Sequence, residues 1–317
     1  MPLATKQAGN FKDNQKHFLT REAKIAMLVY WLGVDGGGSG TRVILANAAG
    51  AVLSRASAGP SALGQGARAA WQNILTAVRQ AFASAHVEVP PWSQCALGAG
   101  LSGVSHAPLV AEFMALNPGF LHLVLESDAY IALLAAHDGQ PGVMVAAGTG
   151  SIGEALYSDG HRRQVGGWGF PVGDEGSGAW LGLRAMAHAQ QTMDGRMPGG
   201  TLAARIQQQC GADTAQLRQW CACARQFEYA QLAVAVFESA ADDQVAEQLL
   251  VEAATAIERI AIALDPSTDL PLAIYGSVGR ALLPRLTPIT RDRCIATPRD
   301  APHGALTLIR QWLSKNP

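Results

Sequence analysis

The stretch Asp35-Gly36-Gly37-Gly38-Ser39-Gly40-Thr41-Arg42 decides the fold of this chain. It stands between two apolar runs, residues 28–34 and 43–46, which have the composition of β-strands. Glycine lets a backbone approach a ligand closely, and exposed N–H groups and hydroxyls are the donors that phosphate oxygens need. We therefore expect a β-hairpin whose tip binds phosphate through Gly36, Gly37, Gly38, Ser39 and Thr41. Asp35 is either a turn cap or a carboxylate that holds Mg²⁺, usually through water, beside the phosphates.

A second tip of the same kind lies about one domain further along the chain. The segment Gly148-Thr149-Gly150-Ser151 separates two more strand-like runs, residues 143–147 and 152–157. On its own this segment is either a plain hairpin turn or a phosphate-binding tip. Paired with the first tip, it predicts two hairpins from two domains that hold one nucleotide between them.

Composition favours a two-domain globular protein. The 317 residues are 49% hydrophobic and 15% charged, which provides enough apolar material for two cores. The net charge of −1 gives no reason to expect nucleic acid as a partner. Five scattered cysteines fit a reduced, cytoplasmic protein, and no apolar run is long enough for a membrane partner to be expected. Polar residues 1–26 are expected to form a flexible leader rather than a signal peptide.

The expected elements occur twice in the same order. Residues 27–137 and 138–302 each begin with three strands and continue with alternating helices and strands, which predicts two mixed α/β domains. A helical region at about 175–264 is inserted in the second domain. It is followed by a strand at 271–276, a helix at 279–286 and a strand at 293–297. The C-terminal helix, 303–317, is expected to pack on the first domain, and Gly304 would permit close approach to another element.

Other candidate site residues follow strands. Asp128 comes after strand 121–125 and is either the N-cap of the next helix or a general base. Gly276-Ser277 is either a plain turn or a clearance for an adenine ring. The glycine-dense segments Gly166-Gly167-Trp168-Gly169 and Gly173-Asp174-Glu175-Gly176 are expected to lie against a ligand, although Asp174 is also a candidate helix cap.

A competing motif keeps a different enzyme class open. The segment Gly98-Ala99-Gly100-Leu101-Ser102-Gly103 matches the dinucleotide fingerprint, with a strand before it and a helix after it. Glu126 stands near the position of a ribose-binding acid. An NAD-dependent oxidoreductase is therefore an alternative. However, three strands precede this motif, and the alternative leaves the other glycine clusters unexplained.

In combination, the motifs resemble the N-acetylglucosamine kinase group, which shares the BadF/BadG/BcrA/BcrD ATPase family within the actin/Hsp70/hexokinase superfamily. The resemblance covers nearly all of residues 30–312. Bacterial glucosamine kinases are also similar, through Asp128-Ala129-Tyr130 and the region 226–264. The resemblance implies an α/β fold of two ribonuclease-H-like (actin-like ATPase) domains with a nucleotide cleft between them.

The resemblance also implies a role for each motif. ATP and Mg²⁺ would lie between the two tips, with Asp35 helping to place the metal and Gly276 and Ser277 beside the adenosine. Asp128 would be the catalytic base. One departure from the family is Ala62 or Leu63, where an asparagine is usual, and this removes one hydrogen bond to the sugar. The sugar would contact Ser61, Ser102, Gly103, Gly167, Trp168, Asp174 and Glu175.

These expectations describe an ATP-dependent kinase for the 6-hydroxyl of N-acetylglucosamine, with glucosamine as the alternative substrate. A non-catalytic sugar sensor on the same scaffold is a further alternative. The presence of both Asp35 and Asp128 argues against that degenerate form. A homodimer is compatible with the resemblance.

Overall fold

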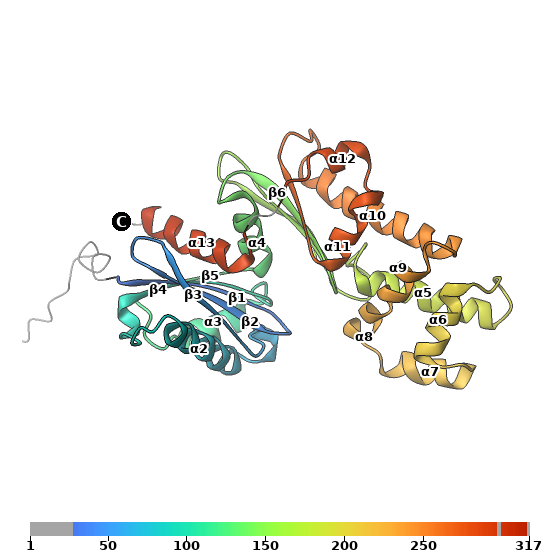
Figure 1. The fold of residues 1–317 in the computed structure, drawn as a ribbon, viewed down its shortest axis with the longest axis horizontal. Helices are drawn as coiled ribbons and strands as arrows, with labels where there is room; N and C mark the ends of the chain where they lie inside the picture. The colour runs from blue at the N-terminus through green and yellow to red at the C-terminus, as the bar shows by residue number, and fades with distance from the viewer. Residues whose placement is uncertain (1–27, 297–298, 316–317) are drawn as a thin grey trace, which may run out of the picture.

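The computed structural model describes residues 28–296 and 299–315 and contains two β-sheets with helices packed on them (Figure 1). The expected leader, residues 1–26, lies outside the described residues. No helix within the described ranges has the length and hydropathy needed to cross a bilayer.

The first sheet has the strand order β3-β2-β1-β4-β5. The first three strands form an antiparallel meander, and β4 and β5 run parallel to β1. The strands are β1 (Tyr30–Gly36), β2 (Thr41–Asn47), β3 (Val52–Ala58), β4 (Cys95–Leu101) and β5 (His122–Glu126).

Helices cover both faces of this sheet (Figure 1). One face carries α2 (Ala67–Ser84) and α3 (Ala107–Ala115), with the 3-10 turns η1 (Leu63–Gln65) and η2 (Trp92–Gln94) beside them. The other face carries α4 (Asp128–His137) and α13 (Ala301–Lys315). We call the first sheet with α2, α3 and α13 the first lobe. Because both faces are covered, β4 is buried along its whole length.

The second sheet has the strand order β8-β7-β6-β9 and repeats the same plan. Its first three strands are an antiparallel meander, and β9 runs parallel to β6. The strands are β6 (Gly142–Ala147), β7 (Ser151–Leu156), β8 (Arg162–Gly166) and β9 (Leu272–Tyr275). The predicted α/β class with two mixed sheets is confirmed.

The second sheet with its helices forms the second lobe. Its longest helix, α10, packs on β6, β7 and β8, and α11 packs on β6 and β9. The helices are α5 (Gly178–Met193), α6 (Thr201–Cys210), α7 (Thr214–Cys223), α8 (Gln226–Gln231), α9 (Ala233–Ser239), α10 (Gln244–Leu264), α11 (Ser277–Leu282) and α12 (Pro288–Asp292), with the 3-10 turn η3 (Leu283–Arg285).

The prediction of a strand at 293–297 is wrong. The structure has a single parallel bridge there, between Leu272 and Cys294, and residues 297–298 lie outside the described part. Arg293, the C-cap of the α12 helix that the sequence analysis missed, still has helical backbone angles (φ −87°, ψ −6°), so pairing with β9 begins only at Cys294. The helix expected at 279–286 begins earlier, at Ser277, and continues into η3.

The helix α4 joins the two lobes, together with α13 of the first lobe. Apolar side chains of both helices pack with Met144 and Leu156 of the second sheet in one buried cluster. A side chain on Gly304 would place its Cβ 1.8 Å from the carbonyl oxygen of Ile131 in α4. The close approach predicted at Gly304 is therefore confirmed, and it lets α13 lie directly on α4.

Candidate active site

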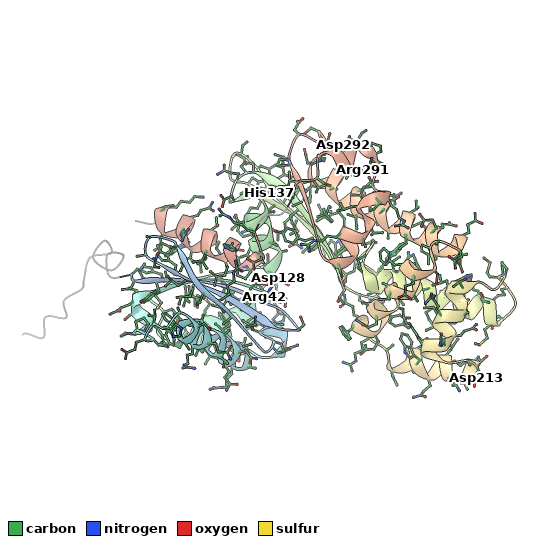
Figure 2. All side chains as sticks on the ribbon, in the orientation of Figure 1. Arg42, Asp128, His137, Asp213, Arg291 and Asp292 are labelled. Carbon is green, nitrogen blue, oxygen red and sulfur yellow. The ribbon has the colours of Figure 1, made fainter. Side chains whose placement is uncertain are left out.

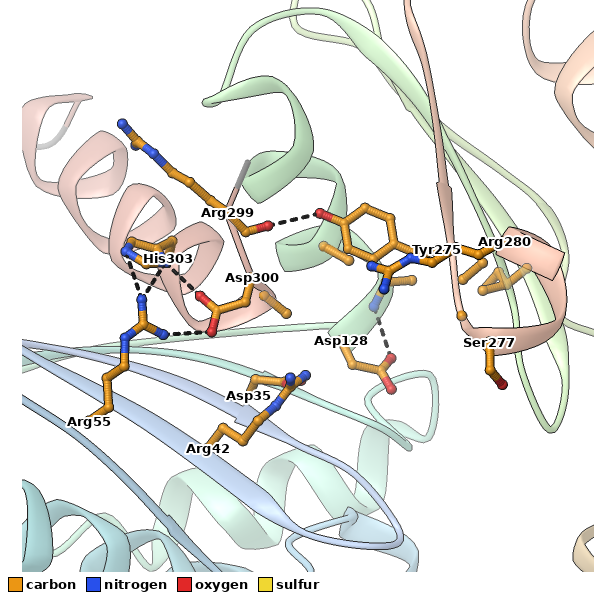
Figure 3. A pocket seen from close by; sticks show the side chains of 16 residues that line it. Asp35, Arg42, Arg55, Asp128, Tyr275, Ser277, Arg280, Arg299, Asp300 and His303 are labelled. Carbon is orange, nitrogen blue, oxygen red and sulfur yellow. Dashed lines mark hydrogen bonds and ion pairs between the residues drawn. The ribbon is translucent and has the colours of Figure 1, made fainter. Parts of the chain in front are cut away.

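A cavity of about 690 Å³ lies between the two lobes. The first sheet contributes Asp35, α4 contributes Asp128, and the second lobe contributes the turn between β9 and α11. Figure 2 shows Asp128 and Arg42 on the side of the first lobe that faces the second. Figure 3 shows Asp35, Arg42 and Asp128 close together, with Ser277 and Arg280 opposite them. The structure thus brings the predicted Asp35, Asp128, Gly276 and Ser277 into one cavity.

Asp35 is held by a cross-strand ion pair. The four-residue tip of the first hairpin sets Asp35 on β1 directly opposite Arg42 on β2. The Arg42 Nε donates to the Asp35 Oδ2 at 2.9 Å. Burial raises the pKa of Asp35, Arg42 partly offsets this effect, and the nearby negative charge of Asp300 adds to it. Arg42 was not among the predicted site residues, although the length of the tip already pairs it with Asp35.

Asp128 is the first residue of α4, not its N-cap. The N-cap is Ser127, whose hydroxyl accepts a hydrogen bond from the Tyr130 N–H at 3.0 Å. The capping interpretation of Asp128 is therefore wrong. Its Oδ1 accepts one bond, from the Ala129 N–H at 2.9 Å. Burial raises the pKa of Asp128 in spite of this bond, and the charge of Asp35 raises it further.

The first glycine tip is held from behind by buried hydroxyls. The Thr41 hydroxyl donates to the carbonyl oxygen of Gly59 at 2.6 Å and lies 2.7 Å from the Ser61 hydroxyl. Both side chains are fully buried. A Cβ on Gly36 would come within 1.9 Å of the Ser61 Oγ, so this position requires glycine. Thr41 and Ser61 therefore shape the tip in this structure, and their hydroxyls are turned inward.

The outer part of the first tip remains open. A Cβ at Gly37 would meet nothing within 4 Å, and Gly38 and Ser39 are exposed. A depression of about 480 Å³ is lined by the tip together with Asp35 and Arg42. The Asp35–Arg42 pair thus borders both this depression and the cavity between the lobes.

The second tip borders a neighbouring pocket of about 250 Å³. Gly148 and Thr149 line it together with residues of α8, α9 and α11. Ser277 lines both this pocket and the cavity between the lobes, so the two spaces adjoin at that residue. Gly276 has φ +84°, and a Cβ there would lie 2.1 Å from the carbonyl oxygen of Ala147. Glycine is thus required at position 276 for the turn between β9 and α11 to pass this close to the second tip.

Within the second tip, Gly150 and Ser151 face the protein. A Cβ on Gly150 would lie 2.7 Å from the Asp174 Oδ2. The buried Ser151 hydroxyl donates to the carbonyl oxygen of Glu175 at 2.8 Å. The tip is therefore anchored to the glycine-dense segment that follows β8.

Asp174 serves as that anchor in this structure and does not cap α5, whose N-cap is Ser177. Its Oδ2 accepts a hydrogen bond from the Gln226 Nε2 at 2.7 Å. Burial raises the pKa of Asp174, and hydrogen bonds from the backbone N–H groups of Ser151 and Gly169 counteract that rise.

The other residues predicted to bind sugar lie outside the described lining of the cavity between the lobes. Trp168 is 85% exposed and, with Glu175, lines a separate pocket of about 270 Å³. The Ser102 N–H donates to the Gly36 carbonyl oxygen at 3.0 Å. Gly103 and Gly167 are exposed and have positive φ angles. Their contact with a sugar stays a prediction.

The sequence analysis missed a polar network at the edge of the cavity, drawn in Figure 3. The Arg55 Nη1 on β3 donates to the Asp300 Oδ2 at 2.6 Å, and the His303 Nδ1 lies 2.6 Å from the Asp300 Oδ1. Burial alone would raise the pKa of Asp300, but the bonds from His303 and Arg55 outweigh it and lower the pKa. The Tyr275 hydroxyl donates to the carbonyl oxygen of Arg299 at 3.2 Å. Asp300 and His303 are three residues apart, but Arg55 comes from β3 and Tyr275 from β9, so no local motif could reveal the whole network.

The sequence profile of the BadF/BadG/BcrA/BcrD ATPase family matches residues 32–269. This chain belongs to that family. A glucosamine kinase from Vibrio cholerae is 30% identical over 278 residues, which cover 87% of this chain and 94% of that protein. A crystal structure from Chromobacterium violaceum, provisionally named an N-acetylglucosamine kinase, is 44% identical and has a TM-score of 0.86 over 89% of this chain and 99% of the other.

A ROK family glucokinase from Streptomyces griseus has a TM-score of 0.52 at 18% identity over 89% of this chain and 99% of the other, a likeness that concerns the fold alone. Together, these matches confirm the predicted actin-like ATPase fold.

Membership of this ATPase family removes the oxidoreductase alternative, and the geometry gives the reason. A Cβ on Gly98 would lie 2.1 Å from the carbonyl oxygen of Ala305 in α13. A Cβ on Gly100 would lie 2.3 Å from the Ile131 side chain in α4. These glycines on β4 are therefore required by helix packing, and no space is left at them for a pyrophosphate.

The ATPase family also implies a divalent metal, and the residues of the cavity fit one. Mg²⁺ usually keeps several waters and takes one or two protein carboxylates together with substrate phosphates. Asp35 and Asp128 supply carboxylates to one cavity. No cluster of three or more His, Cys, Asp or Glu suited to a metal exists in residues 28–296 and 299–315, so an all-protein metal cage is not present there.

Proposed function

We propose that this protein is an ATP-dependent amino-sugar kinase that phosphorylates the 6-hydroxyl of N-acetylglucosamine. The observation that carries the proposal is the cavity in which Asp35 and Asp128 face Gly276 and Ser277 of the other lobe. Phosphoryl transfer requires a carboxylate near the phosphates and a base for the attacking hydroxyl, and this cavity offers both.

The adenosine and the phosphates would occupy adjoining spaces. The pocket beside Gly148 and Thr149 is lined by apolar residues of α9 and α11, among them Val234, Phe237 and Val278, which suits a base and its ribose. It meets the larger cavity at Ser277. A nucleotide that enters there would direct its phosphates toward Asp35 and the open glycines of the first tip.

Asp128 would accept the proton of the attacking hydroxyl. A general base works best when its pKa approaches the working pH, and burial raises the pKa of Asp128 in that direction. Asp35 would hold Mg²⁺. When bound, this ion would neutralise negative charge on the phosphates. Arg42 and Arg280 line the same cavity and add positive charge near the place where negative charge develops.

The names of the relatives support an amino sugar as the substrate. They differ on whether that sugar carries an N-acetyl group. Proteins from Chromobacterium violaceum and Dictyostelium discoideum carry the name N-acetylglucosamine kinase, the former provisionally, whereas the Vibrio cholerae relative is named a glucosamine kinase. Glucosamine is therefore the second candidate substrate. It carries an ammonium group where N-acetylglucosamine carries a neutral amide, so the two differ in charge at neutral pH.

A coupled assay of ADP release over a panel of hexoses and amino sugars tests the proposal. N-acetylglucosamine is expected to give the highest kcat/KM, and 6-deoxy-N-acetylglucosamine is expected to give no turnover above the rate without sugar. Preference for glucosamine would overturn the N-acetyl assignment. Equal ADP release with and without every sugar would overturn the kinase assignment.

A further inference from the structure

A polar cluster adjoins Asp128 without lining the cavity. We call Glu126, Ser127, Tyr130, Glu154 and Arg162 the junction cluster. The Ser127 Oγ donates to the Glu154 Oε1 at 3.2 Å. The Arg162 Nη1 donates to the Glu126 Oε1 at 2.9 Å, and its Nη2 lies 3.6 Å from the Glu154 Oε2. The Arg162 guanidinium also lies 3.2 Å from the centre of the Tyr130 ring.

The junction cluster connects the two sheets at the start of α4. Glu126 is the last residue of β5 in the first sheet, whereas Glu154 and Arg162 stand on β7 and β8 of the second. Glu154 is paired with Gln164, two residues from Arg162, so Glu154 and Arg162 form a diagonal pair on one face of the sheet. The second lobe therefore reaches the residues immediately before Asp128 through side chains.

Glu154 places a carboxylate in a buried position between the two sheets. It is 3% exposed, and burial raises its pKa although Arg162 and the Ser127 hydroxyl counteract the rise. A buried charge is costly unless it is paired and hydrogen-bonded. The cluster supplies Glu154 with a charged partner, Arg162, and a hydrogen-bond donor, Ser127. Ser127 is the N-cap of the helix that begins with Asp128.

We propose that Glu154 is a positioning residue for Asp128, which it aligns from the second lobe through the Ser127 hydroxyl. The inference rests on the proposed kinase function. The Ser127 hydroxyl donates a hydrogen bond to Glu154 and accepts one from the Tyr130 N–H, so Glu154 fixes the orientation of that hydroxyl. The backbone of Asp128 follows directly from that cap. Misplacement of a reacting group by about 1 Å can cost about 100-fold in rate.

Two substitutions at Glu154 separate positioning from folding. Glu154→Leu removes the acceptor for Ser127 but leaves Arg162 paired with Glu126. Glu154→Gln keeps an acceptor oxygen in nearly the same shape. We expect Glu154→Leu to lower kcat about 10- to 100-fold with both KM values changed less than about 3-fold, and Glu154→Gln to keep most of kcat.

A double-mutant cycle with Ser127→Gly tests whether Glu154 affects kcat through the Ser127 hydroxyl. Glycine is a tolerated N-cap, so α4 should still begin at the same place while the bond to Glu154 is lost. The double variant Ser127→Gly/Glu154→Leu should have about the kcat of the worse single variant. Glu247→Gln is the matched control, since it breaks the Arg285 ion pair of the same lobe away from the cavity, and it should leave kcat unchanged.

Hydrogen exchange gives a readout that does not depend on activity. In Glu154→Leu, amides of residues 127–134 should exchange faster than in the wild type, while those of α10 should not change. Wild-type kcat in Glu154→Leu, losses confined to KM, multiplied losses in the double variant or unchanged exchange at 127–134 would each overturn the inference. If the wild type phosphorylates none of the sugars, the proposed function fails by itself, and exchange alone decides whether Glu154 holds the start of α4.

Discussion

Replacement of Asp128 by asparagine removes the proposed base and little else. The amide oxygen of the new side chain can still accept the Ala129 N–H, as Oδ1 does at 2.9 Å, and Ser127 still caps the helix. General base catalysis contributes about 100- to 10,000-fold to rate, or about 2.7–5.4 kcal/mol. We therefore expect Asp128→Asn to lower kcat of the sugar kinase by that factor while ATP binding, followed by calorimetry, stays within about 3-fold.

The same substitution should make the fold more stable at neutral pH. Because burial raises the pKa of Asp128 above its ordinary value of 3.8, the folded state binds this proton more tightly than the unfolded state. Stability from this group is therefore present below pH 3.8 and is lost as pH rises through the folded pKa. Asp128→Asn should raise the melting temperature at pH 7, and its advantage should shrink as the pH is lowered toward 4.

Asp138→Asn is the matched control for the effect on turnover. Asp138 ends the same helix with φ +52°, a conformation that asparagine tolerates, and its ion pair with Arg299 is exposed. It should change kcat less than about 2-fold, as surface pairs contribute little. If Asp128→Asn keeps kcat within about 3-fold of the wild type, Asp128 is not the base.

Three further substitutions test other parts of the site and the fold. Asp35→Asn should raise the Mg²⁺ concentration needed for half-maximal ADP release, because it removes the carboxylate assigned to the metal; an unchanged titration curve would contradict that assignment. Ser277→Phe should weaken ATP binding at least about 10-fold by calorimetry, since its ring would enter both adjoining spaces, and unaltered affinity would show that the nucleotide lies elsewhere. Gly304→Ala should lower the urea unfolding free energy by about 1–3 kcal/mol, because its methyl group meets the Ile131 carbonyl oxygen, and a loss below about 0.5 kcal/mol would mean that α13 shifts without strain.

The sequence predicted those parts of the fold whose causes are local. A glycine-rich tip between two strand-like runs favours a hairpin through its own residues, so the hairpin that opens each sheet could be predicted. The bridge at Cys294, which stands in place of the expected fifth strand of the second sheet, could not be predicted, because it depends on where α12 ends. The fingerprint at Gly98 was ambiguous for a physical reason: a glycine required by helix packing looks the same in sequence as one required by a pyrophosphate.

Residues of the site could likewise be predicted where their placement depends on local sequence. Asp35 and Asp128 stand at strand ends, where α/β folds gather functional groups, and both reach the cavity. Arg42 follows from the register of a four-residue tip and was overlooked. Glu154 bonds to Ser127 and Asp300 bonds to Arg55, and these two partners come from distant segments of the chain.

Folding and catalysis make opposite demands at the start of α4. Burial raises the pKa of Asp35 and Asp128, so each charged carboxylate disfavours the folded state at neutral pH. The opposing contribution lies on the other faces of α4, where Ile131, Leu133 and Leu134 are buried in the cluster shared with the second sheet and α13. Each such side chain contributes about 1.5–3 kcal/mol on burial. Since this packing comes from both lobes, it holds α4 in place against the cost of the carboxylates. Loss of the base should therefore spare the fold, whereas loss of the packing at Gly304 should reduce stability and turnover together.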